Sequence, residues 1–327
     1  CYYRDQEGTR EHWDSSFRTL GIHFEGYLDP YTHFKAAVPV STEGAELGEA
    51  YVTRFALLPG LNLTAGKFRQ QFGVVNRWHK HGLDQVDFPT ALKSIFGPGG
   101  LNQTGFSLDW AMPQLLGASQ GLIVQVTNPD NGTLFTEDGF GTPSALVHYK
   151  LYCDLTKDIY AELGCTALVG WNDEWTVDSG GGPETVHATH PTGVFGVDLA
   201  FLWEPTGRMR YRNIEWRSEF YLLNRELEAP DGSGQDTLES WGFFSYLQAK
   251  LTRTLDVGVR YDYYRPDCKD YAGVAGLELS PHAVVEDDEY QWQVSPYVTW
   301  HQSPFVKVRL EYDHSETYHP FNVELST

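Results

Sequence analysis

The chain has 327 residues and a formal charge of −20, with 41% hydrophobic and 14% aromatic residues. The negative charge argues against a nucleic-acid partner, because nucleic-acid-binding domains need a basic surface. No run approaches the roughly 18 consecutive apolar residues of a transmembrane helix, so the sequence excludes a helical membrane protein. It does not exclude a membrane β-barrel, whose signal is a weak alternation of apolar and polar residues. Four cysteines in a chain of this length make no disulfide framework, and we expect isolated thiols.

Alternation with a period of two runs through almost the whole chain and predicts β-strands. In TLGIHFEGYLD, for example, Leu20, Ile22 and Phe24 alternate with His23 and Glu25. Comparable segments lie at residues 106–112, 145–154, 195–204, 214–222, 255–262 and 306–312. The full count is about sixteen strands, which falls within the even-numbered range of bacterial outer-membrane barrels.

The connections between these segments are alternately short and long. Turns such as DPYT and DLTKD alternate with polar loops such as NPDNGTLFTEDGFGTP and NDEWTVDSGGGPETVHATHP. Outer-membrane barrels have this arrangement, with short periplasmic turns and long extracellular loops, whereas a Greek-key sandwich has no reason to keep it. The sequence therefore predicts an all-β fold, a transmembrane antiparallel up-and-down β-barrel in which residues 1–327 form one domain. Both terminal strands read as incomplete.

One connection is unlike the others. A strand-like run ends at Gly73, and alternation resumes only at Phe106. Long connections of this kind are usually functional or disordered, and Trp78, Phe88 and Phe96 are apolar residues that a disordered segment would waste. We therefore expect this loop to fold back against the barrel wall.

The same loop concentrates imidazole and charged groups. His79 and His81, with Asp87 nearby, have the composition of a zinc or transition-metal site. The alternative, which we favour, is hydrogen-bonded packing that pins the loop to the wall, because H-x-H in a loop has no fixed geometry and two more ligands would be needed. The chain carries none of the enzyme motifs G-x-S-x-G, H-E-x-x-H or a glycine-rich phosphate loop. We predict neither an enzyme nor a bound cofactor.

Polar and charged residues on the inward faces are expected to line a water-filled pore. They could set up a transverse field that tunes the passage of ions, or they could be solvated charges that select nothing. Their mixed signs favour neither cations nor anions. The predicted lining residues are Glu25, His33, Lys35, Asp109, His148, Lys150, Glu215, Arg217, Glu219, Lys250, Arg260, Asp262, Lys307, Arg309 and Glu311.

A family resemblance rests on the segment around the long loop. GKFRQQFG, the loop and the return strand resemble the phosphate-selective and related Gram-negative porins, in which GKF-x-x-x-FG precedes the constriction loop. FGVVNRWHKHGLDQVDFP and FGPGGLNQTG are also similar to poorly characterised outer-membrane barrels, some of them labelled zinc-regulated outer-membrane receptors. The chain departs from the second group at Pro98 and Gly99, where that group has an acidic pair, and it lacks the lysine ladder of the first. The resemblance implies that residues 67–103 constrict the pore, with these side chains near the narrowest point: Arg77, Trp78, His79, Lys80, His81, Asp84 and Asp87.

These observations predict a porin in the outer membrane of a Gram-negative-type bacterium, through which small hydrophilic solutes or ions diffuse passively. The lipid bilayer and lipopolysaccharide would surround it, and a homotrimer is expected because such porins are commonly trimers. Two alternatives stay open. One is a metal (zinc)-linked uptake barrel that uses the loop histidines, and the other is a structural barrel that sheathes a surface or electron-transfer assembly.

Overall fold

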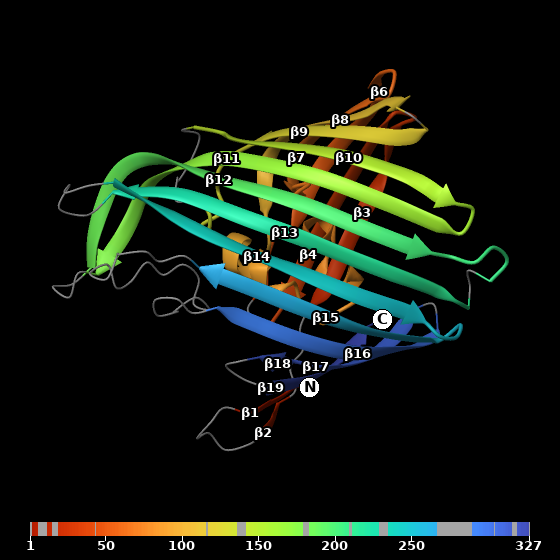
Figure 1. The fold of residues 1–327 in the computed structure, drawn as a ribbon. Coiled ribbons are helices and arrows are strands. Elements are labelled where there is room, and N and C mark those ends of the chain that lie inside the picture. The colour runs from red at the N-terminus through yellow and green to blue at the C-terminus, as the bar shows by residue number, and fades with distance from the viewer. Residues whose placement is uncertain are drawn as a thin grey trace.

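The fold is almost entirely β-sheet (Figure 1). The computed structural model describes residues 2–5, 12–14, 19–42, 44–115, 117–135, 142–178, 183–208, 211–228, 235–266, 290–303, 305–315 and 319–326. Its strands are β1 (Tyr2–Asp5), β2 (His12–Asp14), β3 (Leu20–Asp29), β4 (Thr32–Ser41), β5 (Gly44–Ala45), β6 (Glu49–Leu58), β7 (Leu61–Arg69), β8 (Asn102–Leu115), β9 (Ala118–Thr127), β10 (Ser144–Thr156), β11 (Ile159–Asp178), β12 (Pro183–Trp203), β13 (Asn213–Glu228), β14 (Gln235–Lys250), β15 (Leu255–Pro266), β16 (Gln291–Ser303), β17 (Val306–Tyr312), β18 (His314–Ser315) and β19 (His319–Ser326). Three short helices lie between β7 and β8, namely η1 (Val75–Arg77), η2 (Lys80–Gly82) and α1 (Thr90–Phe96).

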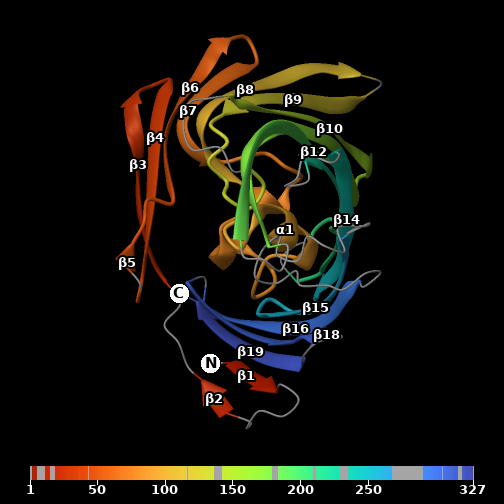
Figure 2. The same ribbon diagram turned by 90° about the vertical axis from the view of Figure 1, so that its left-hand side faces the viewer.

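The strands follow an up-and-down order. Each long strand from β7 to β16 pairs antiparallel with its neighbours in the sequence, as in the β7–β8 register that runs from Leu61 opposite Trp110 to Arg69 opposite Asn102. With interrupted strands counted once, the described residues form 16 strands, as the sequence predicts. The first strand, β1, pairs with β19 on one edge and with β2 on the other. The sheet curves around an interior that contains α1 (Figure 2).

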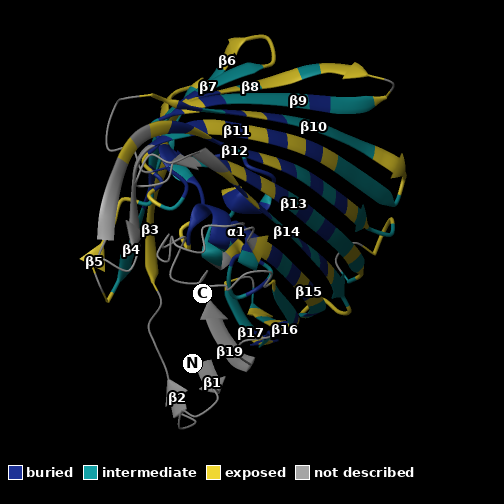
Figure 3. Cartoon of the chain, turned by 60° about the vertical axis from the view of Figure 1, so that its left-hand side comes forward, coloured by how far each residue is buried: buried dark blue, intermediate teal, exposed yellow. Residues whose placement is uncertain are grey.

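Side chains alternate between the outside of the sheet and its interior. Bands of buried and exposed residues follow one another along β11 to β15 (Figure 3). Phe106 and Trp300, apolar residues that alternate with polar ones along β8 and β16, are 61% and 50% exposed. Apolar residues of this size on an outer surface suit a lipid environment, because a bilayer removes them from water. The predicted outward faces are therefore confirmed.

Short turns and longer connections also alternate, but two of the connections are shorter than their polar composition suggests. β11 extends to Asp178, and β12 begins at Pro183. In the same way, β13 extends to Glu228, and β14 begins at Gln235. The prediction of a long loop over residues 172–191 is therefore wrong. Cross-strand pairing carries the β11–β12 hairpin onward through residues such as Trp175 and Val186, and aromatic and β-branched residues favour strands.

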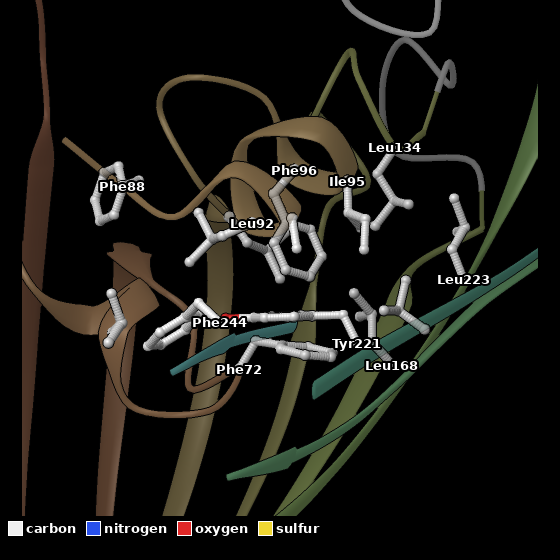
Figure 4. Close-up of a cluster of buried hydrophobic side chains, with 14 of the residues drawn as sticks. Phe72, Phe88, Leu92, Ile95, Phe96, Leu134, Leu168, Tyr221, Leu223 and Phe244 are labelled. Atoms are coloured by element: carbon white, nitrogen blue, oxygen red, sulfur yellow. The ribbon is translucent and has the colours of Figure 1, made fainter. Parts of the chain in front are cut away.

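The apolar core lies inside the barrel. It consists of residues from the β7–β8 connection, with Leu134 and Phe135 from the β9–β10 connection, packed against inward-facing side chains of β10–β15 (Figure 4). The connection spans residues 70–101, so the predicted range of 67–103 includes a few strand residues at each end. Within the described part of the chain, no helix is long and apolar enough to cross a membrane.

Candidate functional site

Residues 70–101, which we call the plug loop, turn into the barrel directly after β7. The turn depends on Gly73, whose φ of 57° lies in the left-handed region. A Cβ at this position would also overlap the carboxylate of Glu219 on β13. Glycine therefore gives the chain both the conformation and the close approach to the wall that it needs to enter the lumen.

An aromatic stack fixes the plug loop to the wall. Phe72 and Phe96 meet edge to face at 4.9 Å between ring centroids, and Phe72 stacks on Tyr221 at 5.6 Å. All three side chains are at most 1% exposed (Figure 4). Full burial of one such side chain stabilises a fold by about 1.5–3 kcal/mol. α1 packs on β13, β14 and β15, so this side of the lumen is filled by protein.

Carboxylates of the wall bind the backbone N–H groups of the plug loop. Glu219 accepts hydrogen bonds from the amides of Val74 and Val75, both at 2.9 Å. Two further carboxylates act in the same way on β15 and β17. Asp262 accepts from the amide of Thr90, and Glu311 from that of Val86, again at 2.9 Å.

Arginines of the wall bind the carbonyl groups of the plug loop. Arg309 donates to the carbonyls of Leu83 and Gln85 at 2.7 and 2.6 Å, and Arg260 donates to that of Asp87 at 2.8 Å. A charged partner makes each of these bonds stronger than a neutral one. We call the inward face of β10–β17, which holds the plug loop in this way, the packed wall.

The prediction that a water-filled pore is lined by certain residues is therefore corrected for seven of them. They face inward as predicted, but they are buried, because the plug loop and their wall neighbours cover them. As residues of a water-filled pore they were predicted wrongly. They are His148, Arg217, Glu219, Arg260, Asp262, Arg309 and Glu311.

The other predicted lining residues keep some contact with solvent. Glu25 on β3 is exposed. The rest are half-buried: His33, Lys35, Asp109, Lys150, Glu215, Lys250 and Lys307.

Opposite the packed wall, the inward face of β3, β4 and β6 forms what we call the open wall. Its centre is Glu49, which lies 2.9 Å from Nε2 of His79 and 3.5 Å from Nζ of Lys35. The His79 ring also meets that of His23 on β3, edge to face, at 5.7 Å. His79 thus reaches from the plug loop to the far side of the lumen, as expected for a residue at a constriction.

A second ionic group lies on the exposed edge of the plug loop. Asp87 contacts Nζ of Lys80 at 3.2 Å and Nζ of Lys93 at 3.0 Å, and all three side chains are between 24% and 37% exposed. Arg77 is exposed. These residues are available to line the remaining passage.

Two predicted constriction residues face the packed wall instead. The Trp78 ring lies 5.3 Å from the guanidinium carbon of Arg217. Asp84 accepts a hydrogen bond from the Tyr246 hydroxyl at 3.3 Å. They help to seat the plug loop rather than to line its open edge.

The structure gives no support to a metal site at His79, His81 and Asp87. Nε2 of His79 is directed at Glu49, and the Asp87 carboxylate is shared by two lysines. The side chain of His81 lies outside the described residues. No group of three or more potential ligands converges among the side chains that the structure describes. The zinc hypothesis remains a prediction without geometric support.

Sequence reasoning missed the aromatic half of the site. Tyr221, Phe244 and Tyr264 face inward on the same strand faces as charged residues, and they form the wall side of the apolar core. The signal was present in NIEWRSEFYLL, where Tyr221 and Leu223 have the same parity as Glu219. An inward face that turns apolar over its last residues indicates that something apolar is packed against it.

Comparison with known proteins shows what this sequence and this barrel resemble. No family model matches the chain. An uncharacterized protein of Aquifex aeolicus is 24% identical over 302 residues, which cover 87% of this chain and 60% of that relative. The chain thus spans about 60% of the length of the curated relative that it matches.

Solved structures of outer-membrane proteins superpose on almost the whole chain. OmpT of Vibrio cholerae, an outer membrane protein, gives a TM-score of 0.60 at 8% identity, over 98% of this chain and 92% of its own. The outer membrane channel DcaP of Acinetobacter baumannii gives 0.60 at 13% identity, over 99% and 93%. The anion-selective porin from Comamonas acidovorans gives 0.58 at 10% identity, over 99% and 95%. The chain has the fold of the outer-membrane porins. The predicted porin-like outer-membrane β-barrel is confirmed at this level.

Proposed function

We propose that the chain is a narrow outer-membrane channel through which small hydrophilic solutes or ions diffuse passively. The observation that carries this proposal is the pair of partly exposed polar surfaces that face each other in the lumen. Glu25 and Lys35 belong to the open wall, and His79, Lys80 and Asp87 belong to the edge of the plug loop. The fold shared with porins and channels supports the same conclusion.

The passage is expected to be small because the plug loop fills the other side of the barrel. Its backbone is held by buried carboxylates and arginines, and its aromatic residues are packed, so it is a fixed part of the lumen. A Gram-negative outer membrane, with lipopolysaccharide around the barrel, and a homotrimeric assembly are parts of the same proposal. A catalytic role is not part of it.

The test is single-channel recording in planar bilayers with site-directed thiol labelling. In a background with the four cysteines replaced by serine, Glu25→Cys introduces a thiol on the exposed inward side of β3. Phe24→Cys, one residue away, introduces a matched thiol on the outward side. A charged, membrane-impermeant thiosulfonate should reduce the current through the Glu25→Cys channel and leave the Phe24→Cys current unchanged.

Two results would overturn the proposal. Absence of any conductance from correctly folded protein would favour a barrel that sheathes another component. Equal sensitivity of the two cysteine variants would show that current does not pass along the open wall.

A further inference from the structure

Two buried carboxylates lie directly opposite each other on the packed wall. Asp198 on β12 and Glu219 on β13 are register partners, and both side chains face inward and are 1% exposed. Directly opposed residues in an antiparallel pair have Cβ atoms about 4.5–5.5 Å apart. Like charges at such a distance repel, and the repulsion is strong where water is excluded.

The two carboxylates differ in their partners. Glu219 is satisfied by the amides of Val74 and Val75 and by the hydroxyl of Tyr221 at 2.6 Å, which are all neutral donors. Neither oxygen of Asp198 has a hydrogen-bond partner in the described part of the structure. A buried carboxylate in this condition is costly, and native proteins rarely leave one uncompensated.

The neighbouring cations are already engaged. Nζ of Lys150 lies 2.6 Å from Glu162, and Arg217 lies 3.2 Å from Glu215 and 3.7 Å from Glu162. These two cations therefore balance two other carboxylates. His148 is a further titratable neighbour on the wall, and its ring is hydrogen-bonded to Thr166. Tyr221 and Asp262 also lie on the wall, and neither of these two side chains adds positive charge.

The space around Asp198 is kept open by glycine. Its carboxylate leans over Gly164 of β11, where a Cβ would overlap both oxygens. On the side of the plug loop, Phe72 covers Gly196, Gly73 borders Glu219, and Val74 and Val75 donate their amides to Glu219. None of these four residues brings a charge, so the plug loop supplies no counter-ion to the pair.

We propose that the Asp198–Glu219 pair binds one monovalent cation, either a proton or an alkali metal ion, and that the bound cation helps to seat the plug loop. Two carboxylates suit a single positive charge. Glu219 connects the pair to the loop, because it holds the amides of Val74 and Val75 at the point where the loop enters the lumen. This inference concerns the packed wall and does not depend on the proposed channel activity.

The experiment measures the thermal unfolding of the purified protein in detergent at constant ionic strength, with N-methylglucamine chloride replaced stepwise by sodium or potassium chloride. An alkali ion that binds only the folded protein raises Tm with the logarithm of its concentration. If a proton fills the site, Tm is insensitive to the salt, and the infrared spectrum instead shows a protonated carboxylic-acid band at neutral pH.

Asp198→Asn should abolish whichever of the two signals the unmodified protein shows. Asp109→Asn is the matched control, because Asp109 faces inward on β8 and is half-buried, with a hydrogen bond from Ser107 at 2.8 Å. The control should keep the signal. The unmodified protein decides the matter even if Asp198→Asn does not fold, because the absence of both signals overturns the proposal. Persistence of the signal in a folded Asp198→Asn variant overturns it as well.

Discussion

The packed wall and the open wall carry similar inward-facing residues but use them differently. On the packed wall, Glu219 and Arg309 bind backbone groups of the plug loop and are almost fully buried. On the open wall, Glu49 is also buried and accepts a hydrogen bond from the amide of Arg69, but it contacts the side chains of His79 and Lys35, which remain a quarter exposed. The same kinds of charge thus serve as anchors on one side of the lumen and as an aperture on the other.

This difference separates stability from conduction. Contacts to the loop backbone do not depend on the loop side chains, so the edge that faces the open wall can vary without releasing the loop. Contacts that depend on side chains, such as that between His79 and Glu49, are the ones that set the passage. Substitutions on the two walls should therefore affect different measurements.

The largest effect is expected from Phe96→Ala. Phe96 is 1% exposed and contacts the rings of Phe72 and Tyr221. Its truncation leaves a cavity in the packed side, and such changes typically lower the free energy of unfolding by about 3–5 kcal/mol. Urea unfolding monitored by tryptophan fluorescence measures the loss. Single-channel recordings should show a larger, noisier current, because the plug loop is less firmly seated.

The control for Phe96→Ala is Tyr27→Ala on β3. Tyr27 is 68% exposed, so its removal should change the free energy of unfolding by little. An equal loss in the two variants would mean that the packed side is no better packed than the open side.

Arg309→Met should have the next largest effect. It removes the two donors to the carbonyls of Leu83 and Gln85 while keeping much of the side-chain volume. Hydrogen bonds to charged groups are worth about 1.5–3 kcal/mol each, and we expect a total loss of about 2–3 kcal/mol because water can replace part of them. Lys307→Met, two residues earlier on the same face, is half-buried and is the matched control. Similar urea midpoints for both variants would contradict a role for Arg309 as a backbone anchor.

Much of the barrel could be predicted from the sequence. Alternation fixes which residues share a face, because side chains on a strand point to opposite sides with a period of exactly two residues, and Phe106 and Trp300 lie outside as that rule requires. The strand count follows from the same pattern. The extension of β11 and β12 to Asp178 and Pro183 was missed, because the polar and glycine-rich composition of this segment favours a loop and outweighs the short alternation of Trp175 and Val177 with Glu174 and Thr176.

The candidate site was only half predictable. The family resemblance predicts His79 and Asp87 near the narrowest point, and both are partly exposed, but it predicts the same for Trp78 and Asp84, which face the packed wall. Parity alone, however, does not distinguish an inward charge in water from an inward charge that binds a loop. Asp262 and Glu25 look alike in the sequence, but one accepts a hydrogen bond from the amide of Thr90 and the other is exposed. That difference depends on tertiary packing between segments more than a hundred residues apart.

His79→Ala should change conduction more than stability. Glu49 is buried, but His79 is a quarter exposed, and without His79 the Glu49 carboxylate keeps Nζ of Lys35 at 3.5 Å and the amide of Arg69 at 3.0 Å, so we expect only a small loss of stability. Loss of the His79–Glu49 contact opens the gap between the plug loop and the open wall, so the single-channel current should rise while the urea midpoint stays close to that of the unmodified protein. His79→Gln is the matched control, because its amide can still donate to Glu49. A midpoint as low as that of Arg309→Met would show that the loop is anchored on both walls.

The smallest effect is expected at the β10–β11 turn, which lies outside both walls. Asp158 accepts hydrogen bonds from the amide of Thr206, at 2.8 Å, and from its hydroxyl. These bonds hold the pKa of Asp158 below its usual value. A lowered pKa in the folded state stabilises the protein above the ordinary aspartate pKa of about 3.9, and this contribution is lost as the pH falls through the folded value.

Asp158→Asn should therefore lower Tm slightly at pH 7, and the difference from the unmodified protein should shrink as the pH is lowered below about 4. Lys157→Gln, at the adjacent turn position, keeps both hydrogen bonds and should show a smaller pH-dependent difference, because Lys157 contributes least to the lowered pKa of Asp158. Because neither substitution touches the lumen, both channels should keep their single-channel current. A current altered by Asp158→Asn would mean that conduction responds to general stability, and the assignment of His79 to the aperture would then need evidence beyond a changed current.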